Sequence, residues 1–233
     1  MADERPLLAV LIDADNVPAR HAEAILKEVS LIGEPALRRV YGDWSSDSLK
    51  GWAKSIPSLG LVARQETANT KQKNASDIGL VIDAMDILHT SKFDGFVLVS
   101  SDSDFTALAN RLREDGLTVI GIGESKTPDS LRNVCNRFIL IENLTADEKT
   151  EASAPKAKGK LSEAYELFIE AMNRIDTEDE WYNLGGVGSM ILAAHPDFDP
   201  RSYGHAKLSG LAKALRDLET KASGNNLLIR LRS

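Results

Sequence analysis

The stretch "LLAVLIDADN", residues 7–16, places two carboxylates and an amide directly after an unbroken run of aliphatic side chains. A short continuous apolar run predicts a strand that is buried on both faces, as strands are in parallel sheets covered by helices. Asp13, Asp15 and Asn16 then follow at the carboxyl end of this strand. Ligands of parallel α/β sheets bind outside the carboxyl ends of the strands, so the cluster marks a candidate functional site.

The same alternation continues through the first 142 residues. Further short apolar runs predict strands at 37–41, 59–64, 95–100, 117–122 and 138–142. The segments between them predict helices at 18–31, 46–54, 75–90, 103–115 and 128–134. A strand followed by a helix, repeated several times, predicts the α/β class, with a mostly parallel sheet flanked by helices.

The composition excludes several classes of protein. The chain is 42% hydrophobic and 27% charged, as globular proteins are, and its formal charge of -7 provides no overall basic field. Any binding of phosphate must therefore depend on local charge or on a metal ion. No apolar stretch approaches about eighteen residues, so we expect no membrane partner. The N-terminus lacks a secretion signal, and the single cysteine, Cys135, excludes an internal disulfide, which suits a cytoplasmic protein.

The composition changes after residue 142. The stretch "TADEKTEASAPKAKGK" has small, charged and proline residues but no large apolar side chain, which is typical of a flexible linker. Beyond it, three helical patterns and a terminal strand or hairpin arm predict a small winged-helix-like domain; these lie at 161–172, 185–195, 205–218 and 225–232. We therefore expect three parts: a first domain at 1–144, a linker at 145–160 and a second domain at 161–233.

Three further carboxylates are expected near the edge that Asp13 occupies. Asp102 and Asp104, in "SSDSDF", follow another predicted strand, and Asp77 lies in the first turn of a predicted helix. Taken singly, each is explained as a helix cap or as a charge that complements the helix dipole. Together they would repel one another and raise one another's pKa unless a cation lies among them. An oxygen-only set without a His or Cys cluster favours Mg²⁺ or Mn²⁺ over Zn²⁺.

The residues around Asp77 carry weaker signals. Asp83 and Asp86 lie farther along the same predicted helix but on a different face, so we expect them to be solvated or to hold neighbouring loops. Lys71 and Lys73 lie in the polar segment before the helix, where they could hold an RNA phosphate near the metal. The alternative is that long loops are polar by default.

Three motifs in the first domain resemble those of the NYN domain family. The motifs are "LIDADN", "KNASDIGLVIDAMD" and "VSSDSDF", in this order, within roughly residues 7–142. The family is a branch of the PIN-like nucleases and includes the LabA-like bacterial proteins. Its pattern is a strand ending in Asp-x-x-Asn, a Lys shortly before an Asp that opens a helix, and a strand ending in Ser-x-Asp-x-Asp-Phe. Asp15 occupies a variable position of this pattern.

This resemblance implies a PIN-like fold and a ribonuclease that depends on Mg²⁺ or Mn²⁺. We expect the ribonuclease to be an endonuclease. Carried over to this sequence, it implies that Asp13, Asp77 and Asp102 are catalytic metal ligands. Asp104 is then a further ligand or an outer-shell base, and Asn16 positions the first loop.

The second domain resembles the OST-HTH domain, also called LOTUS. The resemblance lies in "WYNLGGVGSMILAAHPDFDPRSYGHAKLSGLAKAL", which contains the family's Leu-x-x-Val-Gly, Phe-Asp-x-x-x-Tyr-Gly and Lys-Leu-x-x-Leu patterns. It implies an RNA partner, with protein partners in some members. Most matching positions are apolar or glycine, so they identify the fold better than a binding surface. Our candidate RNA contacts are Arg201, Tyr203, His205 and Lys207.

Metal-dependent hydrolysis of RNA phosphodiesters is the preferred function, and three alternatives stay open. A haloacid-dehalogenase-type phosphatase also carries Asp-x-Asp after its first strand, as nucleophile and general acid. A non-catalytic RNA-binding protein would use the acidic pocket for structural metal only. An adaptor would bind another protein through the C-terminal domain.

Overall fold

The computed structural model of the chain describes residues 5–65, 75–145, 161–177, 179–224 and 226–232. The chain divides into two compact units, Met1–Thr145 and Ala146–Ser233. Beyond Thr145, the predicted linker lies outside the described residues. No helix in the described ranges is both long enough and apolar enough to cross a membrane.

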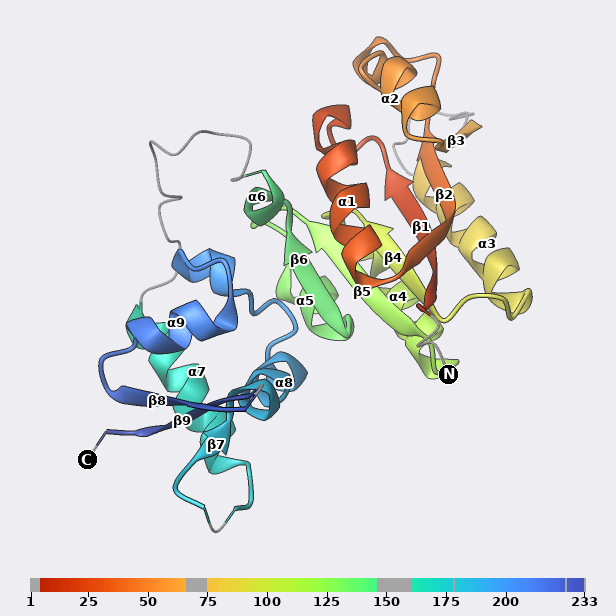
Figure 1. Ribbon diagram of the computed structural model, residues 1–233. Helices are drawn as coiled ribbons and strands as arrows, with labels where there is room; N and C mark the ends of the chain where they lie inside the picture. Colours follow the sequence, from red (N-terminus) through yellow and green to blue (C-terminus); the bar gives the residue numbers. More distant parts are fainter. Residues whose placement is uncertain (1–4, 66–74, 146–160, 178, 225, 233) are drawn as a thin grey trace. The chain divides into compact units, whose positions relative to one another are not determined.

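The first unit contains a six-stranded, all-parallel sheet (Figure 1). The strands are β1 (Leu7–Asp13), β2 (Glu34–Gly42), β3 (Val62–Gln65), β4 (Gly95–Val99), β5 (Thr118–Gly123) and β6 (Arg137–Leu140). Their order is β3-β2-β1-β4-β5-β6, so the chain first builds outward from β1 and then returns to its other side. The loops after β1 and β4 therefore diverge, and such a switch point is where open α/β sheets bind ligands. The predicted α/β class is confirmed.

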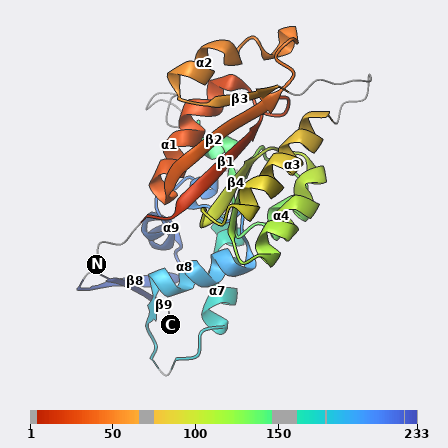
Figure 2. The same ribbon diagram turned by 90° about the vertical axis from the view of Figure 1, so that its right-hand side faces the viewer.

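Helices cover both faces of this sheet (Figure 2). One face packs against α1 (Ala22–Ile32), α2 (Trp52–Ser58) and α6 (Ile141–Leu144); the other packs against α3 (Ala75–His89), α4 (Thr106–Glu114) and α5 (Asp129–Val134). Right-handed crossovers produce this division, because the chain moves across the sheet first in one direction and then in the other. The aliphatic run of β1 is buried from both sides, as its unbroken apolar pattern predicts.

The bounds of several predicted elements in the first unit differ from the structure, and the strand predicted at 59–64 begins only at Val62, as β3. The predicted helix at 46–54 is instead a 3₁₀ turn, η2 (Asp47–Leu49), followed by α2. Ser46 begins the turn by accepting a bond from the Ser48 N–H, and Gly51 then separates the two elements. The predicted strand at 138–142 ends at Leu140, where α6 begins.

The second unit combines three helices with a small antiparallel sheet. Its elements are α7 (Leu161–Asn173), β7 (Tyr182–Asn183), α8 (Leu184–Ala194), η5 (Pro200–Tyr203), α9 (Leu208–Ala214), β8 (Leu218–Ser223) and β9 (Asn226–Leu231). The sheet has the order β7-β9-β8, and one core joins it to the helices. The predicted helix at 205–218 is too long at both ends. Leu215 and Leu218 keep a helical spacing, but they are buried beyond the end of α9, and Leu218 begins β8.

Candidate active site

Asp13 is the last residue of β1, and its side chain is only 1% exposed. Its Oδ1 accepts backbone N–H groups from Asp15 at 3.1 Å and from Asn16 at 3.3 Å. Its Oδ2 accepts the side-chain amide of Asn16 at 2.6 Å and the hydroxyl of Ser100 at 2.8 Å. These four bonds use the four acceptor positions of a carboxylate. Asp13 therefore fixes the loop after β1, and Asn16 and Ser100 fix Asp13.

The environment of Asp13 acts on its pKa in two directions. Burial raises the pKa of this carboxyl above its ordinary value, and the Asp15 charge adds to the rise. The bonds from Asn16 and Ser100 lower the pKa, but they do not cancel the effect of burial. Ser100 was not among the predicted site residues. The pairing of Ile12 with Val99 places this serine beside Asp13, so the strand register was the signal that would have found it.

The bond from Ser100 to Asp13 supports a prediction about stability. Ser100→Ala is expected to lower the free energy of unfolding of the first unit by about 1.5 kcal/mol, because hydrogen bonds to charged groups contribute about this much. Urea titration measures the change. Ser103→Ala is the matched control, since Ser103 is exposed and its hydroxyl makes no hydrogen bond within the described residues. Equal losses for the two variants would contradict the role given to Ser100.

Asp102 and Asp104 lie in the loop that follows β4. Asp102 caps the 3₁₀ turn η3 (Ser103–Phe105), because its Oδ1 accepts the Asp104 N–H at 2.9 Å. Its own N–H donates to Ser100 Oγ at 3.1 Å, which ties the loop to the residue that holds Asp13. The cap uses one carboxylate oxygen and leaves Oδ2 without a partner among the described residues. Capping and metal binding by Asp102 are therefore compatible.

The pKa of Asp77, in the first turn of α3, indicates that the carboxylates lie close together. Burial is the largest of the causes that raise the pKa of its carboxyl to about 6, and the charges of Asp13, Asp102, Asp104 and Asp15 follow in that order. Such an influence requires the five carboxylates to lie in one region. The structure thus brings together acidic residues from three separate parts of the sequence.

The acidic group suits a divalent ion in its donor atoms but not in its present spacing. Its donors are carboxylate oxygens, the ligands that Mg²⁺ and Mn²⁺ prefer, and their charges oppose the ionisation of Asp77. Within the described ranges, however, no three His, Cys, Asp or Glu side chains lie close enough together to hold an ion. The donor chemistry therefore fits, while the ligands would have to draw together by side-chain rotation. Asp13 would have to give up one of its four bonds.

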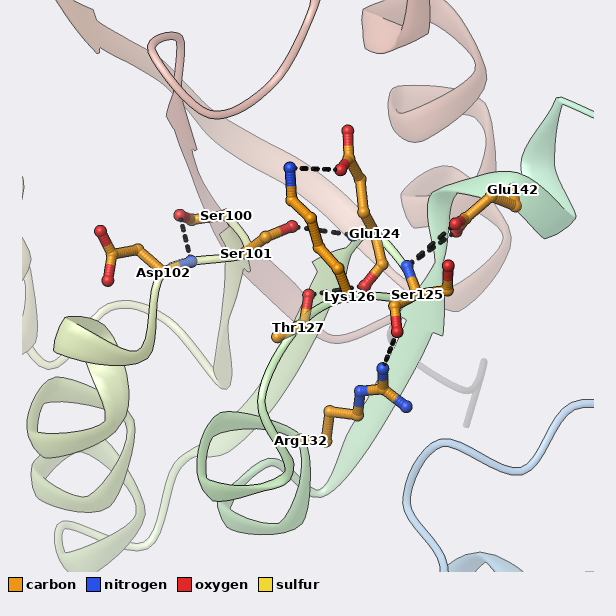
Figure 3. A network of polar contacts seen from close by, with 9 residues as sticks. All are labelled: Ser100, Ser101, Asp102, Glu124, Ser125, Lys126, Thr127, Arg132 and Glu142. Atoms are coloured by element: carbon orange, nitrogen blue, oxygen red, sulfur yellow. Dashed lines mark hydrogen bonds and ion pairs between the residues drawn. The ribbon is translucent and has the colours of Figure 1, made fainter.

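A third loop, after β5, is bound to the loop after β4 (Figure 3). Ser101 Oγ accepts the Glu124 N–H at 2.8 Å, and the carboxylate of Glu124 pairs with Lys126 at 2.7 Å. The Ser125 N–H donates to both oxygens of Glu142, at 2.9 and 3.1 Å. Glu124 was not among the predicted site residues, although it follows β5 directly.

Asp83, on α3, holds its helix to the sheet. Its carboxylate accepts bonds from Arg39 and from the Tyr41 hydroxyl on β2, and it faces Arg64 of β3 at 3.4 Å. Burial acts to raise the pKa of Asp83, but the bonds from Tyr41 and Arg39 keep it below its ordinary value. Of the two predicted roles, solvation and anchoring, the structure gives Asp83 an anchoring one, while Asp86 is exposed.

The predicted RNA contacts of the first unit, Lys71 and Lys73, lie outside the described residues. Those of the second unit divide into two kinds. Arg201 binds Asp199 through three bonds of 2.7 to 3.0 Å, and the Tyr203 ring packs on Phe198 with centroids 5.9 Å apart. Both therefore stabilise the second unit. The remaining two are a half-buried His205 and an exposed Lys207.

Comparisons with known proteins agree with this architecture. Residues 7–142 match the NYN domain, and residues 157–229 match the OST-HTH/LOTUS domain. The fold is that of a PIN-like domain, and it is joined to a small second domain. Since the first match spans more than half of the sequence, the chain belongs to the NYN domain family. Both predicted family resemblances are confirmed.

A solved structure is similar to part of the chain. It is a protein of unknown function from Vibrio parahaemolyticus, with 18% sequence identity and a TM-score of 0.50, and the match covers 60% of this chain and 96% of that chain. This likeness shows the fold alone. No curated protein matches the chain.

Proposed function

We propose that this protein is a divalent-metal-dependent ribonuclease that hydrolyses RNA phosphodiesters at the carboxyl edge of β1 and β4. The observation that carries the proposal is the pKa of Asp77, which rises to about 6 by burial and by four neighbouring carboxylates. Carboxylates that oppose one another's ionisation are stabilised by a bound cation. Membership of a family of PIN-like nucleases supports the same function.

The acidic residues would bind the ion, and their hydrogen-bond partners would orient them. Asp77, Asp102 and Asp104 would hold Mg²⁺ or Mn²⁺ together with Asp13. When bound, such an ion activates water as the nucleophile and offsets the charge that develops on the phosphate. Asn16 and Ser100 orient Asp13, which would give up one of its four hydrogen bonds in order to bind the ion. Asp102, through its cap, positions the backbone of the loop that carries Asp104.

The second unit would contribute RNA affinity, since OST-HTH/LOTUS domains bind RNA. Lys207→Ala is expected to raise the Kd for RNA about threefold, the effect of losing one phosphate contact, with no change in melting temperature. Arg201→Ala is expected to destabilise the second unit by about 2 kcal/mol, because it leaves the buried Asp199 without its partner. Fluorescence anisotropy and thermal unfolding measure the two effects. A loss of stability in Lys207→Ala would contradict this division of roles.

The burial of Asp13 argues against a haloacid-dehalogenase-type phosphatase. Its carboxylate is 1% exposed and accepts four hydrogen bonds, whereas a nucleophile must reach the phosphorus of its substrate. The second candidate is an RNA-binding or adaptor protein without catalysis. It is favoured by one observation, that no three acidic side chains in the described ranges converge on an ion position.

A cleavage assay distinguishes nuclease from binding protein. The purified full-length protein is incubated with a panel of single-stranded and structured RNAs in Mg²⁺, in Mn²⁺ or in EDTA. The proposal expects products in at least one metal and none in EDTA. Equal cleavage in EDTA would overturn the metal dependence. Binding of RNA without cleavage in either metal would favour the second candidate.

A further inference from the structure

A hollow of about 610 Å³ lies beside the acidic group, in the same unit. The loop after β1 forms one wall, including Asp15 and Asn16, and η2 with α2 forms another. Since Asn16 also binds Asp13, the hollow and the candidate active site share a wall. Its volume lies in the range of about 300 to 1,000 Å³ that is typical of pockets for small ligands. A ligand in this hollow would therefore lie next to the proposed reaction.

Two cations line the hollow and suit it to a phosphate. Arg20 and Lys54 are exposed, and neither forms an ion pair with any residue that the structure describes. Cationic side chains are the usual partners of RNA phosphates. Of the two carboxylates in the lining, Glu124 is paired with Lys126, and Asp15 belongs to the group around Asp77, where the proposed ion offsets its charge.

One residue of the lining carries a buried polar atom without a partner. Trp52, which lines it, is 2% exposed, and its indole Nε1 has no acceptor among the described residues. Buried donors without an acceptor are rare, and they mark places where water or a ligand completes the hydrogen bond. Two hydroxyls in the lining, from Ser48 and Ser55, add neutral polar groups of the kind that contact ribose or a base edge.

The position of the hollow relative to the sheet determines the path that a bound RNA strand would take. The hollow lies on the α1 and α2 face, whereas Asp77 and Asp104 belong to α3 and η3, which lead into the opposite face. Asp13 ends the central strand between the two. A chain bound at both places therefore crosses the edge of the sheet with its middle phosphate over Asp13.

We propose that this hollow binds one nucleotide of single-stranded RNA, adjacent to the phosphate that is cleaved, with its own phosphate held by Arg20 and Lys54. The proposal rests on the proposed ribonuclease function and names the substrate class, because a nucleotide enters such a hollow only when its base is unpaired. Cleavage of the strand takes place at the neighbouring carboxylates.

Photocrosslinking tests the hollow separately from catalysis. The full-length protein is mixed in EDTA with an eight-nucleotide oligouridylate that carries one 4-thiouridine, moved along the strand in a series. After irradiation, mass spectrometry identifies the labelled peptides. At one register or more, we expect label within residues 14–20 or 48–55.

The variant pair Arg20→Ala with Lys54→Ala is expected to reduce this label at least about tenfold, as the loss of two phosphate contacts predicts. The control pair is Lys27→Ala with Lys92→Ala, which removes the same charge from exposed positions outside the hollow and is expected to keep the label. Label found only elsewhere, or equal label in both pairs, would overturn the inference. If the label behaves as expected while no RNA is cleaved in any metal, the hollow stands and the nuclease function fails.

Discussion

Replacing Asp77 with asparagine is expected to lower the rate of RNA cleavage at least about a hundredfold while making the first unit more stable. The loss of rate follows from the removal of a proposed metal ligand, since changes even in the residues around metal ligands cost about ten- to a hundredfold. The gain in stability follows from the raised pKa of the Asp77 carboxyl. A residue that impairs the fold at neutral pH is typical of a site kept for function.

The size and sign of the stability change can be worked out. A rise in pKa from 3.8 to about 6 means that the folded chain keeps a proton that the unfolded chain has lost, between about pH 4 and pH 6. The free energy of unfolding therefore falls as the pH rises through this window. The full difference is about 3 kcal/mol, but Asp77 is partly exposed and solvent screens its neighbours, so we expect about 1 kcal/mol at pH 7. The melting temperature of Asp77→Asn then rises by about 3 °C.

Asp86→Asn is the matched control, because Asp86 is an exposed residue of the same helix. It is expected to change neither the cleavage rate nor the melting temperature. Asp13→Asn is a less informative variant, since an amide placed against the amide of Asn16 and the hydroxyl of Ser100 would disturb the loop after β1. If Asp77→Asn cleaved RNA as fast as Asp86→Asn, Asp77 would not be a ligand.

Adding Mn²⁺ or Mg²⁺ to the metal-free protein is expected to raise the melting temperature of the first unit by about 8 °C when the ion is at a hundred times its Kd. Binding to the folded state alone contributes about 2.7 kcal/mol at that concentration. In Asp77→Asn the same addition is expected to have little effect. Differential scanning calorimetry measures both, and Ca²⁺ serves as a comparison ion. An equal shift in the wild type and in Asp77→Asn would place the ion elsewhere.

The same titration is expected to depend on pH. Below about pH 6 the Asp77 carboxyl is protonated in the metal-free protein, so an ion must displace that proton. The concentration of Mn²⁺ that gives half of the thermal shift should therefore rise about fivefold between pH 6 and pH 5, and much less between pH 8 and pH 7. A concentration that stays constant across this range would show that Asp77 does not take part.

Much of this fold follows from local patterns in the sequence. The aliphatic run before Asp13 indicates a strand buried on both faces, and its repetition with intervening helices indicates a parallel sheet. The carboxylates that follow these strands must then meet at one edge, because parallel strands all end on the same side. The acidic group around Asp77 is predictable on this basis.

Other features depend on contacts that spacing does not encode. Ser100 becomes a partner of Asp13 only through the pairing of β1 with β4. Arg201 and Tyr203 are residues of types that often bind RNA, but Asp199 and Phe198 engage them within the second unit. The end of α9 was not predicted, because Leu215 has the spacing of a buried helical residue although it lies in the turn after the helix.

The anchoring of α3 through Asp83 restricts how the acidic residues can come together. Asp83 lies less than two turns after Asp77 and is bonded to Arg39 and Tyr41 of β2. A rigid shift of the helix toward β1 would break these bonds. Capture of an ion must therefore proceed through rotation of short side chains about a fixed frame, which is a fast local adjustment with a small entropic penalty.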